Sequence, residues 1–175
     1  TIFKKNFESN ARNDRYEKLN RYAKINNCKI IFTAHHFDDQ VETLIMKDLS
    51  YSDWLSYLGI CEMYNKIRRP MLGLSKNEIY LYAKTNNLIW FEDETNGDLS
   101  ILRNKIRNNI RKKFYNQEYI NNLLNENIKS KIKIIEFDKY FKECADKTFH
   151  VKMNAIFLNN NINSYFSDVY LKLFI

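Results

Sequence analysis

The sequence contains little glycine, little proline and few cysteines. Its three glycines, Gly59, Gly73 and Gly97, lie far apart, so none belongs to a glycine-rich loop whose backbone N–H groups could hold phosphate. The three cysteines are isolated and odd in number, which favours reduced thiols in a cytosol-like compartment over a disulfide framework. The sequence contains no C-x-x-C pair that would indicate a metal site. It also contains no run of about 18 apolar residues that would predict a membrane span.

The net charge of +7 is concentrated in one segment. Residues 101–142 carry 11 basic and 4 acidic side chains, and this difference equals the whole net charge. Within the segment, apolar residues recur every four positions from Leu102 to Phe114, which predicts an amphipathic helix. Its basic side chains are Arg103, Lys105, Arg107, Arg111, Lys112 and Lys113. An ordinary solvated face is one explanation, but the concentration of charge favours contact with a phosphate backbone.

A cluster of histidines and acids follows a short apolar run in the first third of the chain. Residues 29–33 (KIIFT) predict a buried strand, and apolar residues from Val41 to Leu49 recur at helical spacing. The cluster between and within these elements is His35, His36, Asp38, Asp39 and Glu42. Ligands of open α/β sheets bind outside the carboxyl ends of the strands, so this is the candidate site. One alternative explanation of the cluster is a helix cap, but a cap would need only one carboxylate. The other is a zinc or iron site, since histidine and aspartate both bind these metals.

Other elements follow from periodicity and caps. Ser75 and Glu78 have the spacing of a capping box, which predicts a helix ending near Asn86. Residues 50–68 are expected to be irregular or weakly helical. The remaining expected elements are helices at 8–26, 99–114, 117–147 and 163–174, a short strand at 88–91, and a strand or extended segment at 151–158. Together they predict an α/β fold, a partial Rossmann-like parallel sheet with helices, followed by an all-helical segment.

Four segments resemble the motifs of one family in the same order. Residues 33–43 (TAHHFDDQVET) resemble the A-H-H-x-D-D-Q-x-E-T signature of the tRNA(Ile)-lysidine synthase family, in the N-type ATP pyrophosphatase superfamily. The others are residues 8–16, which resemble E-x-x-A-R-x-x-R-Y, residues 69–72 (RPML), which resemble R-P-L-L, and residues 90–107, which resemble W-x-E-D-x-[ST]-N, D and R-N-x-x-R. A single match would carry a real risk of coincidence, but four in order across roughly two-thirds of the chain are not expected by chance.

The resemblance implies an adenine nucleotide alpha hydrolase-like fold and a carbon–nitrogen ligase. In that reaction ATP, with Mg²⁺, adenylates the C2 oxygen of the wobble cytidine in an isoleucine tRNA with a CAU anticodon. Free lysine then attacks C2 and displaces AMP. Residues 1–105 would be the C-terminal half of the catalytic domain, and residues 106–175 a mostly helical region that contacts tRNA. A cytoplasmic protein of bacteria, or of a plastid-type organelle, is implied.

The resemblance also implies a role for each candidate residue. His35 and Asp39 would serve adenylation and lysine positioning, and Glu42 would hold the lysine. The residues expected near ATP are Arg12, Arg15, His36 and Asp38. The residues expected at the RNA are Asp93, Asn96, Arg103, Asn104, Arg107 and Arg111. Exposed helix charge is the alternative for Arg12 and Arg15, and a loop cap with a surface helix is the alternative for the RNA group.

Two departures from the family pattern leave a choice of functions open. The family's phosphate loop, S-G-G-x-D-S, is absent, so we expect it upstream of Thr1 and expect this fragment alone to be inactive. The family's glycine-rich turn is replaced over residues 50–59, where only Gly59 remains and Tyr51 and Trp54 are bulky. The chain is then part of a ligase or a non-catalytic tRNA-binding remnant of the same family. A sulfur-transferring relative would need paired cysteines, which this chain lacks.

Overall fold

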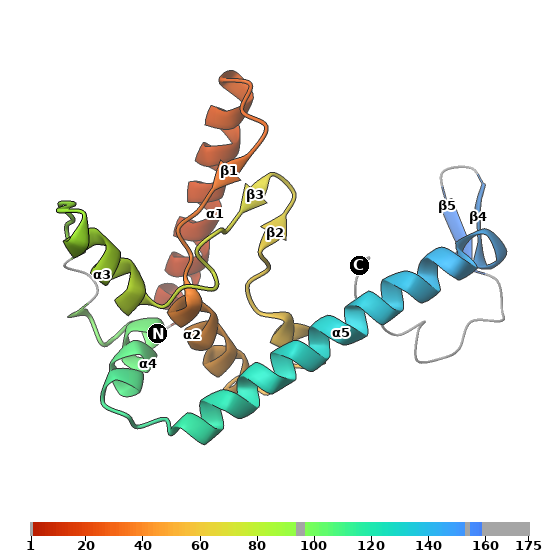
Figure 1. The fold of residues 1–175 in the computed structure, drawn as a ribbon. Coiled ribbons are helices and arrows are strands. Elements are labelled where there is room, and N and C mark those ends of the chain that lie inside the picture. The colour runs from red at the N-terminus through yellow and green to blue at the C-terminus, as the bar shows by residue number, and fades with distance from the viewer. Residues whose placement is uncertain (1, 94–96, 153–154, 159–175) are drawn as a thin grey trace. The chain divides into compact units, whose positions relative to one another are not determined.

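The computed structural model describes residues 2–93, 97–152 and 155–158. The chain divides into two compact units, Thr1–Leu124 and Asn125–Ile175. The elements, shown in Figure 1, are α1 (Ile2–Ile25), β1 (Ile31–Phe32), α2 (Phe37–Asp48), the 3₁₀ helix η1 (Trp54–Leu58), β2 (Met63–Tyr64), β3 (Ile67–Arg68), α3 (Lys76–Thr85), α4 (Leu102–Arg111), α5 (Gln117–Thr148), β4 (Phe149–Lys152) and β5 (Ala155–Leu158). No helix among the described residues has the length and apolar character that crossing a bilayer requires.

A small three-stranded sheet forms one part of the first unit, in the order β1-β3-β2. β1 pairs with β3 in parallel, Ile31 opposite Ile67, and β2 pairs with β3 in antiparallel. Helix α1 runs along this sheet (Figure 1), where Ala23 forms a buried cluster with Ile31 and Ile67. The strands bury these apolar side chains against a helix, as a parallel pair in an α/β fold does.

Helix α2 is the centre of the main core. Its buried residues Val41, Leu44 and Ile45 are spaced at i, i+3 and i+4, so they lie on one face of the helix. Ile106 of α4 and Leu123 at the start of α5 complete the cluster. The amphipathic pattern of each segment therefore selects the face by which it packs.

The beginnings of α2 and α3 are fixed to each other by hydrogen bonds. The backbone N–H of Phe37 donates to the carbonyl of Leu74 at 2.8 Å, and the N–H of Lys76 donates to Asp38 Oδ2 at 2.7 Å. Ser75 and Glu78 form the predicted capping box, since each backbone N–H donates to the other side chain. The start of α2, which carries the candidate site, is therefore fixed to the start of α3.

The turn after η1 depends on one glycine. Gln40, buried in α2, accepts a 2.6 Å hydrogen bond from the backbone N–H of Ile60 through Oε1. Gly59 has φ +62°, and a Cβ at this position would lie 2.6 Å from Gln40 Nε2. A side chain here would meet both backbone strain and a buried amide.

The predicted α/β class is confirmed, with a small parallel pair and helices. β2 and β3, within 50–68, were missed because each strand has only two residues. The strand predicted at 88–91 is wrong: the N–H of Leu88 donates to the carbonyl of Ala83 and closes α3, and no strand is assigned to these residues. The domain boundary expected near residue 105 stays a prediction.

The second unit contains the rest of α5 and a hairpin. β4 and β5 pair in antiparallel, Phe149 opposite Leu158, and the hairpin begins two residues before the 151–158 region where a strand or extended segment was expected. The helical stretch expected at 117–147, in one piece or two, is confirmed as the single helix α5. The helix expected at 163–174 lies outside the described residues.

We expect Gly59→Ala to lower the free energy of unfolding by about 1–3 kcal/mol, the usual cost of a residue forced into such backbone geometry. Gly73→Ala is the control, because no atom lies within 4 Å of its added Cβ. Chemical denaturation of both variants measures the difference. Equal stability of the two variants would contradict the role given to Gly59.

Candidate functional site

The site lies where β1 ends and α2 begins (Figure 1). His35 and His36 belong to the extended residues between the two elements, and Asp38, Asp39 and Glu42 to the first turns of α2. The predicted change from strand to helix is therefore confirmed. The geometry brings in a partner that the sequence pattern did not predict, helix α4, which packs against α2.

Glu42 is a carboxylate held in the core between two arginines. Its side chain is 1% exposed. Its Oε1 accepts from Arg107 Nε at 2.6 Å, and its Oε2 accepts from Arg103 Nε at 2.8 Å and Arg107 Nη2 at 3.0 Å. A buried carboxylate requires such charge-assisted bonds, because burial without them would be very unfavourable. The bond to Glu42 is the main reason that the pKa of Arg107 is raised.

Asp39 extends the same network by one helical turn. Its Oδ1 lies 3.1 Å from Arg103 Nη2 and 4.0 Å from Arg107 Nη2. Its Oδ2 accepts a 2.9 Å hydrogen bond from the backbone N–H of His36, which satisfies a free donor at the helix start. The two carboxylates and two guanidinium groups together carry no net charge. We call these four residues, Asp39, Glu42, Arg103 and Arg107, the ion-pair network.

His35 lies beside the network as a partly buried imidazole. Its Nδ1 is hydrogen-bonded to Thr33 Oγ1 at 3.0 Å. Burial lowers the pKa of His35, Asp39 opposes this, and the positive charges of Arg69, Arg12 and Arg103 lower the pKa further. The ring is therefore neutral at pH 7, and it lies within electrostatic reach of arginines from separate parts of the chain.

His36 and Asp38 are oriented by the helix start. His36 Nδ1 is 3.6 Å from Asp38 Oδ2, and its Nε2 is 3.6 Å from Asp39 Oδ2. Within the part of the chain that the structure describes, Nδ1 is buried with no hydrogen-bond partner. Asp38 also holds the N–H of Lys76, so this carboxylate already has a structural use. No group of three histidine, cysteine or acidic side chains suited to a metal ion occurs among the described residues.

The residues expected at the RNA fall into separate environments. Arg103 and Arg107 face the carboxylates of α2, and Asn104 is buried, with its side-chain amide donating to the carbonyl of Asp98 at 3.1 Å. Arg111 is exposed, as are Lys105, Lys112 and Lys113 on the same segment. Asp93 is exposed, and Asn96 lies outside the described residues. Contact of any of them with RNA stays a prediction.

Of the residues expected near ATP, His36 and Asp38 lie at the start of α2, whereas the two arginines belong to α1. Arg12 and Arg15 project from α1 as exposed side chains, and the Arg12 guanidinium lies 5.2 Å from the centre of the Tyr16 ring. Arg12 reaches the site electrostatically through its effect on His35. ATP binding by these residues and by His36 and Asp38 stays a prediction.

Arg69 is a further residue that the candidate set omitted. It is 7% exposed, its Nη1 donates to the carbonyl of Cys61 at 2.6 Å, and its Nη2 contacts the Tyr16 hydroxyl at 3.4 Å. Arg69 thus connects α1, the segment before β2 and the end of β3. The R-P-M-L segment was the available signal, since a basic residue directly after an apolar strand is not needed for strand formation.

Comparison with known proteins decides the family. The model of the PP-loop domain matches residues 2–114. The chain belongs to the PP-loop domain family. The matched PP-loop region includes the whole ion-pair network, His35 and Arg69.

Several relatives of this PP-loop chain bear the name tRNA(Ile)-lysidine synthase. The Enterococcus faecalis protein is 36% identical over 110 residues, which cover 61% of this chain and 24% of the relative. The Blochmanniella pennsylvanica protein is 42% identical over 108 residues, covering 59% and 21%. The Wigglesworthia glossinidia brevipalpis protein is 30% identical over 184 residues, covering 90% and 46%. The chain therefore spans less than half the length of these relatives.

Glu42→Gln is expected to destabilise the first unit by about 3 kcal/mol, the lower end of the range for breaking a buried ion pair, because both arginines retain some solvent contact. Asp14→Asn is the control, since its pair with Lys18 is exposed to solvent and is expected to contribute little to stability. Urea denaturation measures both. A loss as small as that of the control would show that the network adds no stability.

We expect stability to fall as the pH is lowered through 6.5. The unfolded chain protonates His35 at its ordinary pKa of 6.5, whereas the folded protein protonates it only at lower pH. The unfolded state therefore binds more protons between the two values, and stability decreases there as pH falls. His35→Gln should flatten the pH dependence of the unfolding midpoint in this window. Parallel curves for the two proteins would exclude this role for His35.

Proposed function

We propose that the protein containing this chain is a tRNA(Ile)-lysidine synthase. The observation that carries the proposal is the charged cluster at the end of β1, which lies within the PP-loop match and coincides with the A-H-H-x-D-D-Q-x-E-T pattern. The names of the relatives support it. In the proposed reaction the C2 oxygen of the wobble cytidine attacks the α-phosphorus of ATP and releases pyrophosphate. The lysine amine then attacks C2, loses a proton, and AMP leaves with the C2 oxygen.

In this proposal, His35 and Asp39 act at the reacting groups. A neutral imidazole can exchange a proton near pH 7, and the environment of His35 lowers its pKa in the direction that keeps it neutral. Asp39 lies at the rim of the network, with part of its side chain in solvent. Asp39 can therefore orient the ammonium group of the substrate lysine through the part of its side chain that faces solvent. We assign lysine positioning and acceptance of its proton to these two residues.

Glu42 has a different place in the proposal. Both of its oxygens are already bonded to guanidinium groups. Holding the lysine ammonium, as the resemblance implies, requires Glu42 to exchange Arg103 or Arg107 for the substrate. We assign Glu42 a positioning role in which it fixes the two arginines and, through them, Asp39.

We assign ATP and Mg²⁺ to His36 and Asp38 at the start of α2 together with Arg12 and Arg15 of α1. Arg12 and Arg15 are guanidinium groups suited to phosphate, and His36 is a partly buried ring whose Nδ1 has no hydrogen-bond partner among the described residues. Mg²⁺ in such sites uses one or two carboxylates besides the phosphates. Asp38 fits that requirement in part, because its side chain is 43% exposed. When bound, the ion would neutralise phosphate charge.

We expect the complete protein to release pyrophosphate from ATP only with an isoleucine tRNA that has a CAU anticodon, and to form lysidine when lysine is added. Asp39→Asn should abolish lysidine formation while it leaves tRNA affinity nearly unchanged. Pyrophosphate measurement with matched and mismatched tRNAs tests the assignment. Equal release with any tRNA would overturn it, and tRNA binding without any turnover would favour the alternative, a non-catalytic tRNA-binding remnant.

We propose that the exposed basic side chains that follow Arg107 in the chain contact RNA phosphate. Replacing Arg111, Lys112 and Lys113 together by Gln should flatten the log–log salt dependence of tRNA affinity by about two to three units, since each contact contributes a slope of roughly −0.7 to −0.9. Replacing Lys24, Lys29 and Lys66 by Gln is the control, because it removes the same charge beside another pocket. Similar slopes in both triple variants would show that the contact is not local to this segment.

A further inference from the structure

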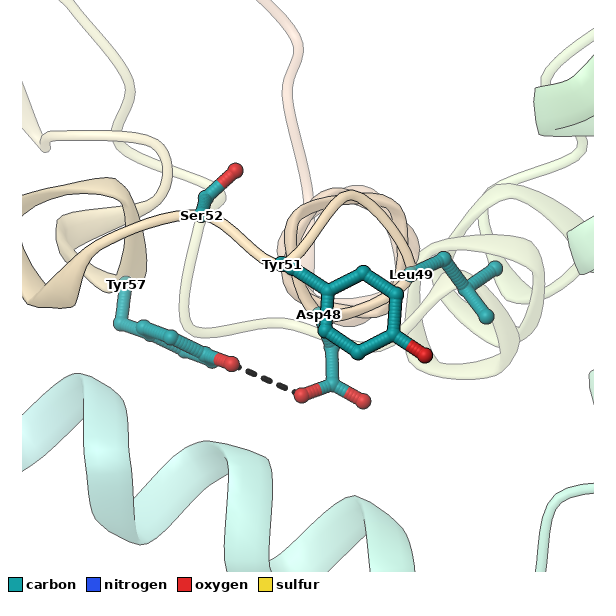
Figure 2. A pocket seen from close by; sticks show the side chains of 5 residues that line it. All are labelled: Asp48, Leu49, Tyr51, Ser52 and Tyr57. Atoms are coloured by element: carbon teal, nitrogen blue, oxygen red, sulfur yellow. Dashed lines mark hydrogen bonds between the residues drawn. The ribbon is translucent and has the colours of Figure 1, made fainter.

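A pocket of about 370 Å³ lies at the end of α2, away from the cluster of histidines and acids. Figure 2 shows the side chains that line it: Asp48, Leu49, Tyr51, Ser52 and Tyr57. It falls in the stretch where the related family has a glycine-rich turn and this chain has bulky residues. Two tyrosine rings, a carboxylate and a hydroxyl are thus gathered at one surface site.

Tyr51 is the unusual residue of this pocket. Its side chain is 98% exposed, so its ring contributes almost no burial to the fold. Its φ is +48°, in the left-handed region that is unfavourable for a bulky residue. Four other non-glycine residues of the described chain have positive φ: three are asparagines, which tolerate this region better, and the fourth is Lys113. Glycine at position 51 would relieve the strain, and packing within the described chain does not account for the exposed ring.

The remaining wall of the pocket is held by the core. Tyr57 packs against the cluster that contains Leu44 and Ile106, and its hydroxyl donates to Asp48 Oδ1 at 2.7 Å. Tyr119 donates to Asp48 Oδ2 at 2.6 Å. Each carboxylate oxygen can accept one more hydrogen bond. Asp48 therefore presents a fixed acceptor beside an exposed aromatic ring.

This combination suits a flat ring that carries hydrogen-bond donors. Unpaired RNA bases are recognised by stacking on aromatic side chains and by hydrogen bonds to their edges, and stacking is worth more than an exposed cation–π contact. Lys47, exposed on the last turn of α2, supplies a positive charge for a neighbouring phosphate. Resting on the function proposed above, we propose that Tyr51 stacks on an unpaired base of the tRNA and that Asp48 accepts a hydrogen bond from its exocyclic amino group.

The base bound here is not the one that reacts. α2 has 12 residues, which corresponds to roughly 18 Å between its two ends. A base in the pocket, beside Asp48, is therefore separated from Asp39 by nine residues of the helix, a rise of roughly 14 Å. The pocket would position the RNA by a second nucleotide, while the cytidine enters the charged cluster.

The test measures binding of an isoleucine anticodon stem-loop RNA to the complete protein and to Tyr51→Phe, Tyr51→Leu and Tyr51→Gly. Stacking predicts that Phe retains affinity within about twofold, whereas Leu and Gly lose roughly 5- to 100-fold. The slope of affinity against salt should not change, because no charge is removed. Tyr51→Gly should also raise the melting temperature, so that stability and affinity change in opposite directions.

Tyr82→Leu is the matched control, since Tyr82 is another exposed tyrosine, on α3, and its loss should leave affinity unchanged. Unchanged affinity in Tyr51→Leu, or equal losses in Tyr51→Leu and Tyr82→Leu, would overturn the inference while tRNA binding stands. A loss of free-lysine binding in Tyr51→Leu with intact RNA binding would overturn it in favour of a cation site. Failure of the unmodified protein to bind the stem-loop would overturn the proposed function and this inference with it.

Discussion

Glu42 places a carboxylate inside the core between α2 and α4, and that charge has to be compensated where it lies. Arg103 and Arg107 provide the compensation, one helical turn apart on α4, while Ile106 between them fills the apolar part of the same interface. One face of α4 thus supplies both the apolar packing of the interface and the positive charge that compensates Glu42. α4 can dock on α2 in only one register if both conditions are to hold.

The packing of α4 on α2 also fixes the positions and surroundings of the charged groups of the site. Asp39 lies at the rim of the network and shares Arg103 with Glu42, so its position depends on a residue 64 positions later in the chain. His35 is partly buried beside three arginines and remains neutral. Carboxylate, imidazole and guanidinium groups therefore meet at the end of a strand, with their charges balanced before any substrate enters.

The two ends of α2 have different characters. At its beginning, Asp38 and Asp39 satisfy backbone donors and hold charged partners. At its end, Asp48 joins two tyrosine hydroxyls beside an exposed aromatic ring. A rigid helix of this length can separate a reacting group from a second recognition point. Under the proposed function, the two ends of α2 would be two separate contact points for one RNA.

Local sequence signals were enough to predict α1, α2, α3 and the basic helix, because periodicity, caps and the strand-to-helix change act within a few residues. They also identified His35, Asp39 and Glu42 as one cluster, since these lie within eight positions of one another. The sequence did not reveal that Arg103 and Arg107 neutralise those acids, because a basic helix looks the same whether its partner is RNA phosphate or a buried carboxylate. Nor did it reveal two-residue strands or the burial of Arg69, which depend on contacts across the fold. Local chemistry determined the elements, and only tertiary packing decided which charges face each other.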